Sequence, residues 1–161
     1  MDPRASYLID ILGLVPHPEG GYFREFFRSP SIVTAGETGT RRKAISSIYY
    51  LILAGQVSKF HRVASDEVWH FLEGDTLQLH TLDPDITTVQ THMLGPVSGI
   101  VQPICIVPAA HWQAAEPGGA FTLAGCTVGP GFEYEDFLFL AEDAALRQAV
   151  TERFPGLARL L

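Results

Sequence analysis

The stretch that decides the fold is Gly55-Gln-Val-Ser-Lys-Phe-His61-Arg-Val63-Ala-Ser-Asp-Glu67-Val-Trp-His70-Phe-Leu-Glu-Gly74. It places an imidazole, His61, a few residues before a carboxylate, Glu67, which opens a run of aromatic and β-branched residues typical of a strand. In a hairpin that turns around residues 65–67, both side chains can face one interior. There they could bind a metal, exchange protons or anchor a polar ligand. The alternative is a solvated surface turn.

Length and composition exclude several classes of protein. The 161 residues fit one domain, and 47% hydrophobic with 18% charged residues is a globular composition. A net charge of −7 argues against nucleic acid as a partner, and the basic cluster 41–43 is interpreted as a solvated strand entrance. No apolar run or leader pattern suggests a membrane span or a signal peptide, which predicts a cytoplasmic protein. Cys105 and Cys126 lie in apolar runs and are interpreted as core thiols, with a disulfide as the alternative.

Turn residues divide the chain into short strands between two helices. Asp2, Pro3 and Gly13 are typical of the ends of a helix over 2–13, and Pro155-Gly156 would end a second helix over 143–154. Strands without intervening helices indicate an all-β sandwich or barrel. We expect strands at 22–27, 45–53, 67–72, 76–82, 87–94, 101–107, 113–115 and 121–128, with 137–140 as a further candidate.

The alternation of side chains along the strand expected at 67–72 predicts which residues form the walls of a pocket. In a regular strand 67–72, Glu67, Trp69 and Phe71 share one face, while His70 points to the other unless a bulge intervenes. A carboxylate beside two aromatic rings describes a ligand pocket, although both rings could simply be core.

Further candidates for ligand contact come from neighbouring segments. They are aromatic or hydroxyl-bearing, with ordinary sheet packing as the alternative: Tyr22, Ser47, Tyr49, Phe132 and Tyr134. Glu19, in a Gly-rich loop, either covers the cavity mouth or is solvated, and His111 is exposed unless its turn forms the rim.

The spacing of these residues resembles the two motifs of the cupins. Gly55, His61, Glu67 and Gly74 match the first motif. In the second, Pro108 matches, Ala110 takes the place of a glycine, and Gln113 takes the place of a histidine.

More narrowly, the chain resembles the small cupin family DUF985, also called cupin_5. The segments that carry the resemblance are His17-Pro-Glu-Gly-Gly-Tyr22, Ser47-Ile-Tyr-Tyr-Leu, Phe60-His61-Arg62, Ser65-Asp-Glu-Val-Trp-His70-Phe, Val107-Pro-Ala-Ala-His-Trp-Gln113-Ala-Ala and Gly125-Cys-Thr-Val-Gly-Pro-Gly-Phe132. The resemblance implies a double-stranded β-helix, or jelly roll (RmlC-like), with a ligand cavity in the barrel and a homodimer as the usual assembly.

The departures from the motif shape the functional hypotheses. In classical metal cupins, three histidines and one glutamate bind the ion. In this sequence, Val63 and Gln113 stand at two of the four ligand positions that the resemblance implies. His61, Glu67 and Gln113 would hold a divalent Mn, Fe, Ni or Zn ion only weakly, and without metal His61 and Glu67 remain an acid–base pair. The leading hypothesis is an isomerase- or epimerase-like enzyme acting on a sugar or sugar nucleotide. The alternatives are a non-catalytic ligand-binding or sensing cupin and a purely structural jelly roll.

Overall fold

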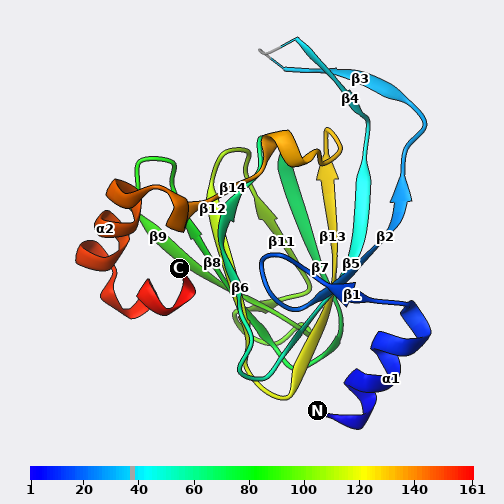
Figure 1. Cartoon of the computed structure of the whole chain (residues 1–161). Helices are drawn as coiled ribbons and strands as arrows, with labels where there is room; N and C mark the ends of the chain where they lie inside the picture. The colour runs from blue at the N-terminus through cyan, green and yellow to red at the C-terminus, as the bar shows by residue number, and fades with distance from the viewer. Residues whose placement is uncertain (37–38) are drawn as a thin grey trace.

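Two six-stranded sheets face each other, and a two-stranded hairpin projects away from them (Figure 1). The computed structural model describes residues 1–36 and 39–161. The first sheet contains, in order, β1 (Val15–Pro16), β2 (Tyr22–Arg28), β5 (Ser46–Leu53), β13 (Phe121–Gly129), β7 (Asp66–Gly74) and β11 (Ile104–Val107). The second contains β10 (Val101–Gln102), β9 (Val89–Leu94), β8 (Leu77–Leu82), β12 (Trp112–Pro117), β6 (Ser58–Arg62) and β14 (Leu138–Phe139). The projecting hairpin is β3 (Ile32–Ala35) with β4 (Thr40–Lys43). The jelly-roll fold expected from the sequence is confirmed.

Strand β13 runs through the middle of the first sheet and explains much of its order. It pairs antiparallel with β5 on one side and β7 on the other, so Cys126 lies opposite both Ile48 and Trp69. Residues directly opposite one another share a face of the sheet. This face and the facing strands of the second sheet enclose a core that contains Tyr50, Trp69 and Leu79.

Two helices cover the outer faces of the sheets. Helix α1 (Pro3–Leu12) begins at Asp2, whose carboxylate accepts from two backbone amides, and it packs Ala5 and Leu8 on the first sheet. Helix α2 (Ala144–Arg153) begins at Asp143 in the same way. Together with the C-terminal helical turn η3 (Pro155–Leu160), it packs on the second sheet around Trp112. Both helices lie where the sequence predicts them.

Several predicted boundaries require correction. The strand expected over 101–107 is two strands in different sheets, because Pro103 between them has no amide hydrogen to continue a ladder. The expected hairpin around residues 65–67 is a corner, since β6 and β7 belong to opposite sheets. Strands β1, β3, β4 and β6 were not expected from the sequence. The strand expected at 137–140 is only the two residues of β14, and the helical turn η2 (Leu140–Glu142) follows it.

Cys105 and Cys126 are free thiols in the core, as the first interpretation had it. Burial raises the pKa of Cys105 to about 11. Among the described helices, none has the length and apolar character needed to cross a bilayer.

Candidate functional site

A cavity of about 100 Å³ lies inside the barrel. Ionisable side chains gather on part of its wall: His17, Glu19, Glu25, Arg28, His61 and Glu67. Apolar side chains complete much of the rest: Phe23, Ile48, Val63, Cys126, Val128 and Phe132. This mixture of apolar lining and a few placed polar groups is characteristic of small-molecule sites, although the volume lies below their usual range of about 300–1,000 Å³.

Glu67 is held by a chain of buried hydrogen bonds. Gln113 is fully buried, and its Nε2 donates to Glu67 Oε2 at 2.6 Å, while its Oε1 accepts from Trp69 Nε1 at 2.9 Å. An indole N–H can only donate, so the amide of Gln113 has one possible orientation. Burial raises the pKa of Glu67, against the opposing effects of nearby His61 and the Gln113 hydrogen bond.

His61 reaches the cavity from the opposite sheet. Its Nδ1 lies 2.7 Å from the carbonyl oxygen of Lys59, and because a carbonyl only accepts, Nδ1 carries a proton and Nε2 is the basic nitrogen. Its ring stacks on Phe137 with centroids 5.4 Å apart. Burial lowers the pKa of His61, which favours the neutral imidazole.

The loop before β2 contributes a second carboxyl group, Glu19, to the same cavity. The loop can lie against β5 and β6 because Gly20 and Gly21 have positive φ angles of 113° and 70°, and a Cβ on Gly20 would meet Val57 O at 2.1 Å. Ser58 Oγ donates to Glu19 Oε2 at 2.9 Å, and His61 Nδ1 lies 3.4 Å from the same oxygen. Burial raises the pKa of Glu19. Of the two alternatives for Glu19, the structure excludes the solvated loop carboxylate, because the residue is buried and lines the cavity.

His17, which the sequence analysis did not single out, completes this polar group. Its Nδ1 accepts from the backbone amide of Glu19 at 3.2 Å, so the unprotonated nitrogen faces the loop. Its ring packs edge-on against Phe23, with centroids 4.3 Å apart, and burial lowers its pKa. Two glycines after His-Pro-Glu were the only signal that this loop turns inward.

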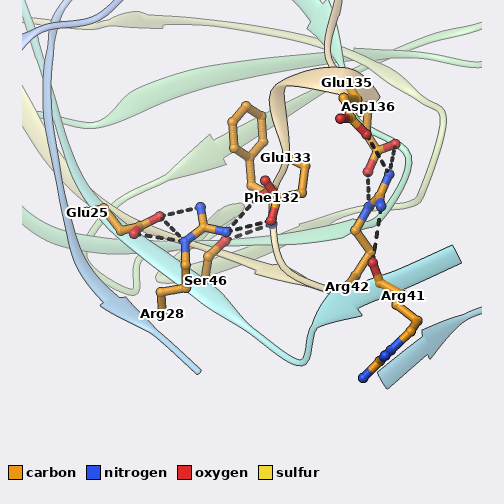
Figure 2. Close-up of polar contacts among 9 residues, drawn as sticks. All are labelled: Glu25, Arg28, Arg41, Arg42, Ser46, Phe132, Glu133, Glu135 and Asp136. Carbon is orange, nitrogen blue, oxygen red and sulfur yellow. Dashed lines mark hydrogen bonds and ion pairs between the residues drawn. The ribbon is translucent and has the colours of Figure 1, made fainter. Parts of the chain in front are cut away.

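A segment after β13 covers one side of the cavity. We call residues 130–137, which include the helical turn η1 (Tyr134–Asp136), the cover segment. Its Phe132 and Tyr134 line the cavity, and the backbone amide of Phe132 donates to Ser46 Oγ at 2.9 Å. Figure 2 shows this segment beside β2 and β4, with which it forms several ion pairs.

The two residues of β5 that were predicted to contact a ligand lie on the face of the strand that points away from the cavity. Ser46 and Ile48 line the cavity, whereas Ser47 bonds to Thr127 and Tyr49 stacks on Phe26 on the other face. Because side chains alternate along a strand, an error of one residue exchanges the two faces. Tyr22 is likewise directed away from the cavity and packs with the cluster under α1.

Two aromatic residues predicted as pocket walls lie in the core beside the cavity. Trp69 and Phe71 share the interior face with Glu67, but neither lines the cavity. His70 occupies the outer face, opposite Ile104 in the register of β7 and β11. His111 Nδ1 lies 3.3 Å from the carbonyl oxygen of Ala109, outside the cavity lining.

The donor set does not fit the metal centre expected from His61, Glu67 and Gln113. The Gln113 carbonyl oxygen faces Trp69, and the group it presents to Glu67 is an NH₂ donor, which cannot ligate a cation. Within residues 1–36 and 39–161, no three His, Cys, Asp or Glu side chains form a metal-binding group.

Comparisons with known proteins decide the family. A family model described as "Cupin superfamily (DUF985)" matches residues 6–140. The chain belongs to this cupin family. An uncharacterized protein of Saccharomyces cerevisiae is 30% identical over 158 residues, covering 89% of this chain and 78% of that protein. A solved structure of a hypothetical protein from Leishmania major has 32% identity and a TM-score of 0.80, covering 97% of this chain and 95% of that one.

More distant cupins share the fold alone. Oxalate decarboxylase from Bacillus subtilis has 14% identity and a TM-score of 0.58, covering 91% of this chain and 36% of that one. The backbone conformation explains why the second cupin motif has a glycine at the position of Ala110. Ala110, in the place of the motif glycine, has a φ angle of 64°, a left-handed conformation that glycine adopts without steric cost.

Proposed function

We propose that this cupin binds a small polar metabolite inside the barrel and that His61 and Glu67 move a proton on it. The reaction would be an isomerisation or epimerisation of a sugar-like hydroxy-carbonyl compound. One observation carries the proposal: a buried imidazole with a free basic nitrogen and a buried carboxyl group reach the same cavity from opposite sheets. Perturbed acid–base groups that converge in a cavity are typical of proton-transfer sites.

The surroundings support distinct roles for the two groups. The Lys59 carbonyl orients His61 and leaves Nε2 as the base. Gln113 holds Glu67, whose raised pKa favours a protonated carboxyl group that can donate to a substrate oxygen. The modest volume of about 100 Å³ favours a small substrate. A three-carbon compound suits this volume, whereas a sugar nucleotide would extend beyond the residues that line the cavity.

Exchange of carbon-bound hydrogen with heavy water tests the chemistry. Dihydroxyacetone is a neutral three-carbon probe whose exchange can be followed by proton NMR. We expect the protein to accelerate exchange and His61→Asn and Glu67→Gln to abolish the acceleration. His111→Asn, which removes an imidazole outside the cavity, is the matched control and should keep it. Equal exchange with wild type and His61→Asn would refute the proposed role.

A non-catalytic binding cupin is the second candidate. It is favoured by Gln113, which stands in a metal-ligand position and is fully engaged with Trp69 and Glu67. This candidate predicts that a metabolite pool incubated with the protein loses no compound, while mass spectrometry detects a retained one. Turnover of any compound that Glu67→Gln abolishes would exclude it.

The assembly and location expected from the sequence also remain proposals. Strand β11 lies at an edge of the first sheet with Ile104 and Ile106 exposed, and such an edge favours pairing with another chain. At the opposite edge of this sheet, the short strand β1 pairs with β2 of its own chain. We propose a homodimer in the cytoplasm. Light scattering coupled to size-exclusion chromatography tests the dimer, and a purely monomeric mass would contradict it.

A further inference from the structure

Arg28 is the one arginine or lysine side chain that lines the cavity within the described residues, and its hydrogen-bond donors are almost all engaged. Its Nε donates to Glu25 Oε1 at 3.0 Å and its Nη2 to Glu25 Oε2 at 2.7 Å. Its Nη1 donates to Glu133 Oε1 and to the carbonyl oxygen of Phe132, both at 3.0 Å. A guanidinium has five N–H donors, and these bonds use four of them, so one N–H of Nη2 is not used by these partners.

These bonds attach the cover segment to the barrel. Figure 2 shows Arg28 between Glu25, on its own strand, and Glu133 on the cover segment. A second arginine, Arg42 of β4, holds the other end of the segment through Asp136, with N···O distances of 2.8 and 2.9 Å. Arg28 therefore holds the cover segment against the barrel. Its positive charge is compensated by the carboxylates of Glu25 and Glu133.

The other ionisable groups give the cavity no positive partner for an anion. Glu19, Glu25 and Glu67 all line it. If the two buried carboxyl groups are ionised, they repel an anion; if they are protonated, they offer no positive charge. Protonation of His61 would place the second proton on Nε2, because Nδ1 already carries one, but burial lowers the pKa of His61 and of His17 and so favours neutral rings. Like charges brought together in a binding site cost several kcal/mol.

We infer that the cavity selects neutral or cationic small molecules and excludes anions, so that its natural ligand is an unphosphorylated, uncarboxylated polyol, hydroxy-carbonyl or amino-alcohol compound. This rests on the proposed function, because it assumes that the cavity binds the metabolite. It narrows that proposal by removing sugar phosphates and sugar nucleotides from the substrate class. It also distinguishes this chain from the related fold of oxalate decarboxylase, whose named substrate is a dianion.

Three probes of matched size test the inference: glycerol (neutral), serinol (cationic) and glycerate (anionic). Each is titrated into isotope-labelled protein, and NMR shifts of Ile48 and Val128, which line the cavity, report binding. We expect glycerol and serinol to bind and glycerate to bind at least about tenfold more weakly than glycerol, a difference of about 1.4 kcal/mol. Glycerate binding as tightly as glycerol would overturn the inference.

Two variants with the same change in charge locate the cause. Glu25→Gln removes one of the two carboxylates that compensate the positive charge of Arg28. The variant should therefore bind glycerate more tightly and serinol more weakly than wild type. Glu135→Gln changes a carboxylate of the cover segment that is 84% exposed and does not line the cavity, so the ranking should stay as in wild type. The same change in both variants would overturn the assignment to Arg28.

The remaining outcomes separate this inference from the proposed function. A preference for glycerate with intact exchange of dihydroxyacetone overturns the charge selection alone. The expected charge ranking without exchange overturns the proton-transfer chemistry alone. If none of the three probes perturbs the cavity residues, the charge selection is overturned, and the exchange of dihydroxyacetone alone decides the proposed function.

Discussion

Replacing Gln113 by leucine would remove the link between the core and the candidate acid. In the structure, one amide satisfies both the indole N–H of Trp69 and an oxygen of Glu67, and all three side chains are buried. Leucine has similar volume and no polar atoms. The variant therefore leaves a buried donor and a buried acceptor without partners.

The expected loss follows from the two broken bonds. An unsatisfied buried polar group costs about 1–3 kcal/mol, and more where it is charged. Partial compensation comes from the apolar leucine, so we expect the free energy of unfolding to fall by about 2–4 kcal/mol, a large share of the total of about 5–15 kcal/mol typical of a domain. The loss should grow at neutral pH, where ionisation of Glu67 is most costly without its donor.

Urea denaturation followed by tryptophan fluorescence measures this loss. Gln90→Leu is the matched control, because Gln90 is exposed on β9 and its replacement should change stability by less than about 0.5 kcal/mol. A double-mutant cycle with Trp69→Phe isolates the bond between Trp69 and Gln113. A loss below about 1 kcal/mol for Gln113→Leu, or additive effects in the cycle, would refute the proposed network.

Four further results are expected. The raised pKa of Glu67 means that the folded state keeps its proton above pH 4.5, so this group makes the fold less stable as pH rises from there, and Glu67→Gln should remove this slope in urea titrations; an unchanged slope would contradict it. Ala110→Gly should raise the free energy of unfolding by about 1 kcal/mol because it relieves the left-handed backbone, and a lower value from urea denaturation would argue against that strain. Arg42→Gln should accelerate amide hydrogen exchange in residues 132–137 because it removes the paired bonds to Asp136, and unchanged protection would show that the bonds do not hold the segment. Gln113→Ala should leave the metal content of protein loaded with zinc or manganese unchanged, whereas loss of stoichiometric metal would show that the amide does ligate.

Local sequence patterns predicted the all-β fold class and both helices. The Gly-His-Glu-Gly spacing, the short apolar runs and the aspartates that begin both helices depend on near neighbours in sequence, and the structure agrees with each. The strand over 101–107 shows the limit of this reasoning. Most of its residues are β-forming and Pro103 is a local signal of an interruption, but only the packing of the two sheets shows that the chain changes sheet at this residue.

The site depended on contacts between distant residues. Alternation predicts that Ser47 and Tyr49 share a face, but it does not say which face is interior, and the structure assigns the cavity to Ser46. Burial of Glu19 results from the close approach of its loop to Val57, a contact that no local pattern encodes.

By itself, the sequence determined an all-β sandwich or barrel, the resemblance to the cupins that implies a jelly roll, and the candidacy of His61 and Glu67, because strand patterns and motif spacings are local properties. Only the tertiary structure decided that Gln113 faces Glu67 with an NH₂ group, because that orientation is imposed by Trp69 from another strand. It also decided that the charge of Arg28 is already compensated by Glu133, 105 residues away along the chain. Hydrogen bonds between distant strands thus determine which polar groups remain free to bind a ligand.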